Sequence, residues 1–493
     1  MNKKNIMIGY APNYGGKIID ELFERNDIDF CFDASCDNCK IVNEKLIEFN
    51  MNLGIKCDYS AVIDLNKLPV IDKELLELML PYESMIIRME ERETELPTVN
   101  YEDAKINYLI HLRFWNYIFV KYKFTGVFFE EVPHTTYSYL IYCLAKVKKI
   151  KILLSDITSI KNIRVYGVND FEDNGSHIEQ YYNKIRKLVI NENELKLGIR
   201  EFFNKIKNNS SKKMSEKEIV SIQKKQRNDM WNYYYNKYLT DTWINNQKKY
   251  LMERKKIKSN PEKWYKKRYD ADIQPYYEKK ELVDVFMRNR AMTLEEYDEI
   301  ADMPIFDEKY IFFGLQMTPE ESTLPRAGVF VDQITSIQIL AQAAEKYGIY
   351  VYVKEHFVQS YRDKRIYSII KSIQNVRLIK SYINSIELIS KALAVSTQTG
   401  TCILESAVMG KPVFVFGRGY DWKGIPNLFE ICNLNDGELA IEKILKGYII
   451  DQQDIINYFF AIQETSLFIS DQNEELCNSS VKQYVNIIEK TIL

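Results

Sequence analysis

The sequence between Val395 and Val413 reads VSTQTGTCILESAVMGKPV and decides the fold of the second half of the chain. The apolar run 392–395 predicts a buried strand, 401–409 a short helix, and 413–416 the next strand. The loop between strand and helix is rich in hydroxyls and glycine. It would place free N–H groups at a helix N-terminus, where a phosphate is favoured. An ordinary strand–helix–strand crossover with a polar loop explains the same pattern.

Strands and helices alternate on both sides of this unit. Strands are predicted at 5–10, 28–32, 126–129, 150–154, 310–314, 349–353 and 376–379, with helices at 17–25, 137–146, 332–347 and 385–391. Such alternation predicts parallel sheets covered by helices on both faces. We therefore expect an α/β fold of two Rossmann-like doubly wound domains. The predicted boundaries are 1–200 for the N-terminal domain, 201–300 for a helical insertion or linker, 301–475 for the C-terminal domain and 476–493 for a C-terminal helix.

Length and charge exclude several classes of protein. A chain of 493 residues is too long for one core, and a net charge of −2 does not favour a nucleic-acid partner. No apolar run is long enough to cross a membrane, and the N-terminal apolar run is too short for a signal peptide. We therefore expect a cytoplasmic protein.

The segment 203–268 differs from the rest of the chain. Lys and Arg far outnumber Asp and Glu in it, and Trp and Tyr are interleaved with them. A helical insertion with a solvated basic face and an aromatic packing face explains this composition. Docking on an anionic surface, such as the face of the inner membrane or an acidic glycan, also explains it. Nucleic acid is the least favoured partner.

One cluster of thiols could suggest a metal. Cys31, Cys36 and Cys39 lie close in sequence, with Cys57 further on. A fourth ligand is not evident and no histidine is near, so free thiols are favoured over a zinc site. We expect neither a metal nor a resident cofactor.

Polar clusters follow three predicted strands of the second half, at 314–323, 354–356 and 396–401. The carboxyl ends of parallel strands meet at one edge of a sheet, so these clusters predict a binding cleft. Lys354 and His356 would supply cationic or donor groups for a phosphate, and no acidic pair with metal-ligand spacing accompanies them. The candidate substrate-binding residues at this edge are Gln316, Glu321, Lys354, Ser396, Thr397, Gln398, Thr399, Gly400, Thr401 and Glu405.

The first half contributes a similar strand end. The run 126–129 is followed by Glu130, Glu131, a proline and His134, and His134 is a further candidate for substrate binding. A carboxylate here could act as a general acid or base in a cleft between the domains, or simply complement the dipole of the next helix. Adjacent strand residues face opposite sides, so only one of the two glutamates can face the cleft.

Several of these motifs together resemble a known family. The runs 310–316, 319–323 and 330–333 look like those of the capsular and surface polysaccharide biosynthesis family, which includes bacterial β-Kdo transferases. The run 351–356 is similar to its Val-Lys-Glu-His-Pro element, and 395–417 to its hydroxyl loop. The run 129–134 resembles its N-domain Glu-x-Pro-His segment. The likeness covers mainly 124–156 and 309–430.

The resemblance implies a fold and a reaction. The expected fold is GT-B, with the active site between the two domains. The expected donor is a CMP-activated ulosonic or nonulosonic acid, which serves as substrate, and the expected acceptor is a glycan of the capsule or lipopolysaccharide. Other polysaccharide-assembly proteins beside the inner membrane are then expected partners. His356 and Lys354 would contact the CMP phosphate, Ser396, Thr397 and Thr399 would cradle it, and Glu405 would hold the ribose. Glu320 matches a nucleophile and Glu131 the acid/base, so the catalytic candidates are Glu131, Glu320 and His356.

This sequence departs from the family pattern at three places. Phe357 stands where the family has proline, the acidic residue is doubled as Glu320 and Glu321, and the insertion 203–268 has no counterpart. Two alternatives stay open. One keeps the fold with another donor, such as a UDP- or GDP-sugar or CDP-glycerol. The other is a non-catalytic glycan-binding partner of the export machinery.

Overall fold

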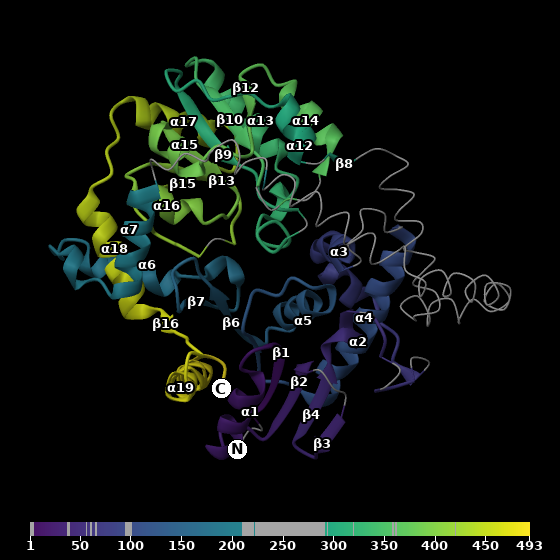
Figure 1. Cartoon of the computed structure of the whole chain (residues 1–493). Helices are drawn as coiled ribbons and strands as arrows, with labels where there is room; N and C mark the ends of the chain where they lie inside the picture. The colour runs from purple at the N-terminus through teal and green to yellow at the C-terminus, as the bar shows by residue number, and fades with distance from the viewer. Residues whose placement is uncertain are drawn as a thin grey trace.

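The computed structural model describes residues 4–36, 40–55, 57–59, 62–64, 67–93, 101–209, 221, 291–292, 294–318, 320–356, 359, 362–419 and 421–493. These residues form two α/β lobes, each built on its own sheet (Figure 1). Most of the predicted insertion 201–300 lies outside the described residues. Among those that are described, no helix has the length and apolarity needed to span a bilayer.

The N-terminal lobe is built on a mixed sheet. Within the described residues its strand order is β16 (Leu467–Phe468), β7 (Ile163–Val168), β6 (Lys151–Ile157), β5 (Gly126–Phe129), β1 (Asn5–Tyr10), β2 (Phe30–Cys36), β4 (Leu46–Asn50) and β3 (Lys40–Asn43). The central pairs run parallel, whereas β3, β7 and β16 run antiparallel to their neighbours. All residues of the central strand β5 are buried, as expected for a strand covered on both faces.

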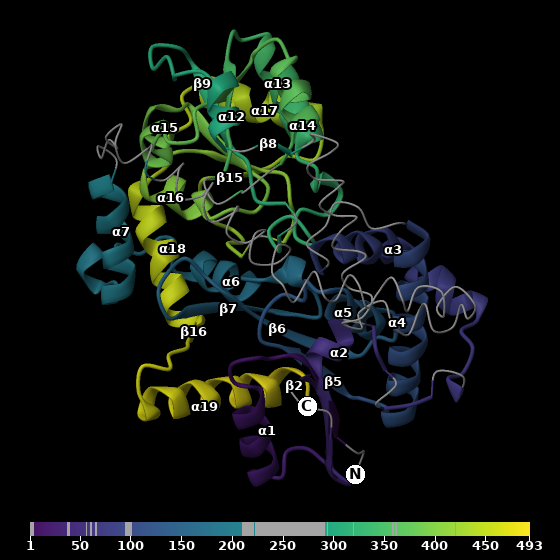
Figure 2. The same ribbon diagram turned by 45° about the vertical axis from the view of Figure 1, so that its right-hand side comes forward.

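Helices cover both faces of this sheet. One face carries α2 (Met51–Ile55), α3 (Lys73–Glu93), α4 (Tyr101–Tyr122) and α5 (Thr136–Val147). The other face carries α1 (Gly15–Glu24) and α19 (Glu474–Thr491), from opposite ends of the chain. Figure 2 shows α19 beside α1 in the lower lobe.

The C-terminal lobe is built on a fully parallel sheet. Its order within the described residues is β12 (Val376–Ile379), β10 (Tyr350–Lys354), β9 (Tyr310–Gly314), β13 (Ala394–Thr397), β14 (Val413–Val415) and β15 (Leu428–Glu430). A short antiparallel ribbon joins β8 (Ala291–Met292) to β11 (Arg362–Asp363). One face packs on α12 (Leu294–Ile300), α13 (Ile334–Glu345), α14 (Lys364–Lys371) and α17 (Leu434–Leu445). The other packs on α15 (Ser385–Lys391) and α16 (Cys402–Val408).

This strand order confirms the predicted α/β fold with two Rossmann-like domains. Most predicted strands and helices lie within a few residues of the observed ones. The largest difference is in β2, which runs to Cys36 because a polar Asp33–Cys36 end follows its apolar half. Pairing with β4 continues to Cys36, with an irregularity after Asp33, where the Asp33 side chain accepts from the Ser35 N–H at 2.9 Å.

Packing runs across the predicted domain boundaries at 200 and 475. The helices α6 (Ser176–Ile185) and α7 (Leu197–Asn209) share one apolar core with α18 (Gln452–Thr465), α15 and α16. After α18 the chain returns to the N-terminal lobe, where β16 joins the N-terminal sheet and α19 packs on α1. Periodicity identifies helices but not their packing partners, so the sequence could not place these crossings.

Candidate active site

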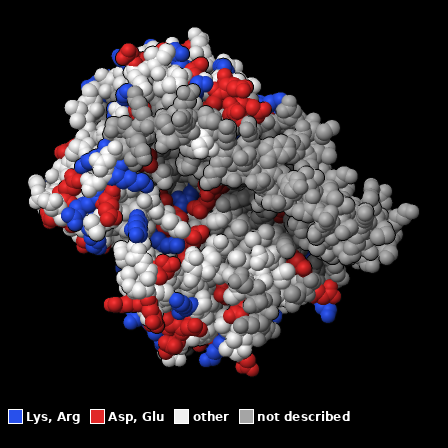
Figure 3. All heavy atoms as spheres, in the orientation of Figure 1, with Lys and Arg blue, Asp and Glu red and all other residues white. Residues whose placement is uncertain are grey.

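The carboxyl ends of β9, β10 and β13 form one edge of the C-terminal sheet. Lys354 pairs with Gly314, and Ser396 pairs with Phe313. This register brings the clusters at 314–323, 354–356 and 396–401 to the same edge, as parallel neighbouring strands require. The edge faces the N-terminal lobe, and Figure 3 shows acidic and basic side chains gathered in the recess between the lobes.

Gln316 connects two of these clusters. Its backbone N–H donates to Gln333 Oε1 at 2.8 Å, and its carbonyl accepts from Arg362 Nη2 at 2.7 Å. Its buried side-chain amide lies 3.0 Å from Thr397 Oγ1. The end of β9 is thereby fixed to the loop that follows β13.

The loop after β13 uses much of its own hydrogen-bonding capacity. Thr397 Oγ1 accepts from the Gly400 N–H at 3.1 Å, and Thr399 Oγ1 donates to the Ser322 carbonyl at 2.9 Å. Gln398 is fully buried and bonds to Ser336, which leaves it no access to a ligand. Of the predicted hydroxyls and amides, Thr401 is the exposed one, whereas Ser396 and Thr397 are buried in the strand.

The helix after this loop is shorter than expected. It begins at Cys402 and ends at Val408, and the Thr401 side chain makes no capping hydrogen bond. Seven residues make about two turns, so few aligned peptide dipoles act on an anion at its start. The helix N-terminus is therefore a weaker phosphate site than the sequence suggested, and charge at this edge comes mainly from side chains.

Lys354 is a buried cation at this edge. It is 6% exposed, and its Nζ donates to the Ser381 carbonyl at 3.3 Å. Burial lowers its pKa to about 8, against the opposing effect of Glu355, Asp298 and Glu405. A group with this pKa is still mostly protonated at neutral pH and retains a positive charge for an anionic ligand.

Glu405 lies one turn into α16 and faces two lysines. Burial raises its pKa, while the positive charges of Lys205 and Lys354 act in the opposite direction. Lys205 comes from the part of α7 that falls within the predicted insertion 201–300. The Glu405 carboxylate therefore offsets part of the positive charge of these two lysines, in addition to the ribose contact that the resemblance implies for it.

Glu355 holds the end of β10 together. It is fully buried and accepts hydrogen bonds from Arg362 Nε at 2.6 Å, Tyr367 Oη at 2.5 Å and the His356 N–H at 2.6 Å. Arg362 also binds the Gln316 carbonyl, so one buried ion pair fixes both the His356 backbone and Gln316. Sequence reasoning missed Arg362, because nothing in its local pattern distinguishes it from a surface arginine.

His356 and Glu320 lie on the same side of this edge. Burial lowers the pKa of the His356 imidazole, Lys354 acts in the same direction, and the negative charges of Glu355 and Glu320 oppose them. Glu320 Oε2 accepts from the Ser322 N–H at 2.8 Å and from its hydroxyl at 2.6 Å. Glu320 therefore stabilises its own turn while its charge acts on His356.

The two glutamates after β5 have different roles. Glu130 is fully buried and accepts from the N–H groups of Asn13 and Tyr14 at 3.0 and 3.2 Å, with Arg164 at 3.4 Å. Glu131 is half-buried, and burial raises the pKa of its carboxyl, with Arg164 opposing and Glu130 adding to the shift. Among the described residues the Glu131 side chain has no hydrogen bond or ion pair, so it is the glutamate available for proton transfer.

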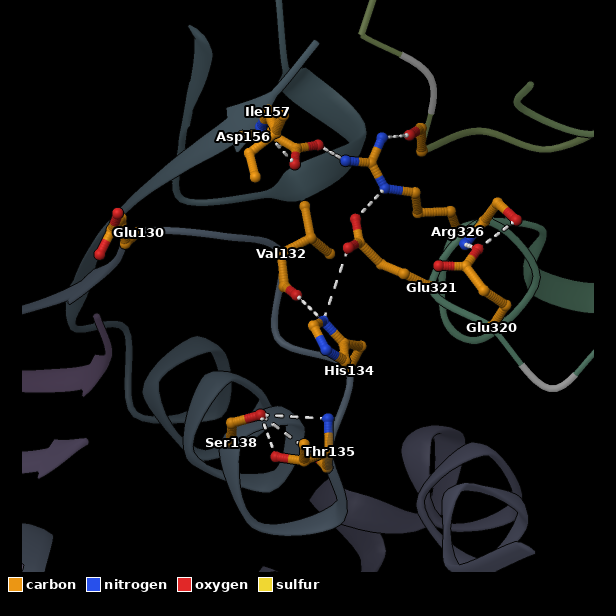
Figure 4. Close-up of polar contacts among 12 residues, drawn as sticks. Glu130, Val132, His134, Thr135, Ser138, Asp156, Ile157, Glu320, Glu321 and Arg326 are labelled. Atoms are coloured by element: carbon orange, nitrogen blue, oxygen red, sulfur yellow. Dashed lines mark hydrogen bonds and ion pairs between the residues drawn. The ribbon is translucent and has the colours of Figure 1, made fainter. Parts of the chain in front are cut away.

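His134 reaches across to the other lobe. Its Nδ1 lies 2.8 Å from the Val132 carbonyl oxygen and 3.5 Å from Glu321 Oε2 (Figure 4). Glu321 Oε1 in turn accepts from Arg326 Nε at 2.7 Å. Figure 4 shows Glu130 apart from this network and the Glu320 carboxylate outside it. Glu321 is therefore engaged between the lobes, whereas the Glu320 carboxylate accepts from Ser322 within its own turn.

Comparisons with known proteins give only distant likenesses. No protein-family model and no curated protein matches the sequence. Among solved structures, S. aureus MnaA with UDP is 13% identical with a TM-score of 0.22. The match covers 37% of this chain and 45%, less than half, of that chain. A β-Kdo 2,7 transferase, KpsC of Thermosulfurimonas dismutans, is 12% identical with a TM-score of 0.31, over 75% of this chain and 88% of that one. A UDP-GlcNAc 2-epimerase of Neisseria meningitidis is 11% identical with a TM-score of 0.26, over 99% and 100%. These likenesses carry no argument about function, which rests on the site itself.

Proposed function

We propose that this protein is a glycosyltransferase that moves a CMP-activated ulosonic or nonulosonic acid, of the Kdo or sialic acid kind, onto a bacterial surface glycan. The observation that carries the proposal is the position of buried Lys354. It lies with His356 and Gln316 at the carboxyl edge of a parallel sheet, and the Glu131–His134 strand end comes from the opposite lobe. Donor and acceptor would then meet between the lobes, as the GT-B arrangement implied by the sequence motifs requires.

Lys354 suits a donor that has a single phosphate. A CMP-linked sugar carries one phosphodiester charge, which one ammonium and a few N–H or imidazole donors can balance. Lys354 and His356 would supply these groups, and the exposed Thr401 would contribute a hydroxyl. The proposal therefore needs no metal for the phosphate.

Glu131 is the proposed acid/base. Its raised pKa makes its carboxylate a better proton acceptor for a glycan hydroxyl than an ordinary glutamate. Glu320 is the proposed nucleophile if the reaction retains configuration, because Glu321 is held by Arg326 and His134. If Glu131 alone activates the acceptor, the reaction inverts configuration.

The place of action follows from the acceptor. A transferase that uses CMP-sugars and extends a surface glycan would act in the cytoplasm, beside the inner membrane where such glycans are assembled. The basic aromatic segment 203–268 would provide a peripheral contact there, and most of this segment lies outside the described residues.

A nucleotide panel tests the donor. The full chain is melted in the presence of CMP, UDP, GDP and CDP-glycerol at equal concentrations. CMP at about 100 times its Kd should stabilise the folded chain by about 2.7 kcal/mol, and the other nucleotides by less. Greater stabilisation by UDP or GDP, or none by any nucleotide, would contradict the proposal. Lys354→Met serves as the control, because it should remove most of the CMP effect.

A further inference from the structure

Arg326 lies at the centre of a charged cluster between the lobes. Its side chain is 6% exposed and pairs with Asp156 of the N-terminal lobe, at the end of β6. It also pairs with Glu321 at 2.7 Å and with Asp421 at 3.0 Å, and its Nη1 donates to the Gly419 carbonyl at 2.6 Å. Figure 4 shows Asp156 and Glu321 pointing toward the guanidinium from different elements.

Two further contacts extend this cluster across the junction. Glu321 continues to His134 at 3.5 Å, and Asp421 Oδ1 accepts from Asn174 Nδ2 at 3.1 Å. Both His134 and Asn174 belong to the N-terminal part of the chain. The carboxylates around Arg326 therefore contact the N-terminal lobe directly or through one more side chain.

The backbones approach closely at the same place. A Cβ on Gly175, which has a φ of +79°, would lie 2.1 Å from the Asp421 carbonyl oxygen. A Cβ on Gly419 would lie 2.8 Å from the Arg326 Cβ. A side chain at either position would push the segments apart, so the junction requires glycine there.

We propose that Arg326 is a positioning residue that fixes one lobe against the other and so sets the separation of Glu131 and His134 from Glu320 and His356. A planar guanidinium can bind carboxylates from two lobes at once, which a single ammonium cannot do with the same geometry. Without it, buried Asp156 and the half-buried Glu321 and Asp421 lose their counter-ion and repel one another. The apolar core around α6 and α18 still joins the lobes, so the change is in their relative orientation. The inference rests on the proposed function only for its kinetic readout.

The test compares Arg326→Met with the wild type in the full chain. X-ray scattering should show a larger radius of gyration, and the kcat for release of CMP from a CMP-sugar with acceptor should fall at least about tenfold, because small misplacements of reacting groups are costly. The Kd for CMP should stay within about twofold, since the guanidinium pairs with Asp156, Glu321 and Asp421 and not with Lys354 or His356. Arg326→Lys should recover part of the kcat. A merely structural arginine would not separate kcat from Kd in this way.

Two further variants keep the test decisive. Arg377→Met is the matched control, because Arg377 pairs with Glu308 within the C-terminal lobe at 2.6 Å and should leave scattering and kcat unchanged. Asp156→Asn removes the N-terminal partner alone, and it replaces Arg326→Met if circular dichroism shows that Arg326→Met does not fold. Unchanged scattering and kcat in the folded variant, or a loss of CMP affinity equal to the loss of kcat, would overturn the inference. A wild type that binds no CMP would refute the proposed function, while the scattering comparison would still test Arg326.

Discussion

Glu355→Gln tests whether the buried ion pair between Glu355 and Arg362 holds the end of β10 in place. The substitution keeps the shape of the side chain but removes its charge and replaces one acceptor oxygen by an NH₂ donor. That donor would face the Arg362 guanidinium or the Tyr367 hydroxyl, which now donate to Glu355 at 2.6 and 2.5 Å. Arg362 is 6% exposed, so its charge stays buried without a counter-ion.

The expected cost follows from this geometry. Removing one partner of a buried ion pair costs about 3–5 kcal/mol of stability. The hydrogen bond from Arg362 to the Gln316 carbonyl offsets only part of this cost. The free energy of unfolding of the C-terminal lobe should therefore fall by about 3–5 kcal/mol. CMP binding should weaken as well, because the His356 N–H and Gln316 both lose their fixed positions.

Urea unfolding followed by circular dichroism measures the first effect, and calorimetry with CMP measures the second. Glu438→Gln is the matched control, since Glu438 pairs with Lys346 at the surface at 3.2 Å. It should change the unfolding free energy by no more than about 0.5 kcal/mol. If Glu355→Gln lowers the free energy of unfolding by less than about 1 kcal/mol, Glu355 does not hold the end of β10 in place.

Three further outcomes are expected. Glu131→Gln should lower kcat by about 10²–10⁴-fold while the Kd for CMP stays unchanged in calorimetry; equal loss of both would place Glu131 in donor binding instead. Lys354→Met should weaken CMP binding by about 1.5–3 kcal/mol, whereas the same change at exposed Lys446 should have no effect. CMP affinity should fall as pH rises through about 8, because Lys354 loses its proton there; a titration that is flat from pH 7 to 9 would argue against Lys354 as the phosphate ligand.

The sequence predicts the strands well where burial is continuous. The run Tyr310–Gly314 is apolar because both faces of β9 are covered, and this leaves a clear signal. The three polar clusters at 314–323, 354–356 and 396–401 could be placed at one edge for a related reason, since parallel strands present their carboxyl ends together.

The sequence could not predict which residues far apart in the chain pair with each other. Arg326 meets Asp156 and Asp421 across long stretches of chain, and no local pattern marks any of them. The same limit applies to Gln398, which was expected to bind substrate but is buried against Ser336. A polar residue in a loop gives the same sequence signal whether its side chain faces a ligand or another loop. Only the packing of the folded chain distinguishes the two cases.

A crystal of the full chain soaked with CMP shows where the nucleotide of the donor binds. We expect the phosphate within hydrogen-bonding distance of Lys354 Nζ and the His356 imidazole, at the edge formed by β9, β10 and β13. CMP bound elsewhere on the chain, or no CMP at a concentration that saturates the protein in calorimetry, would contradict it.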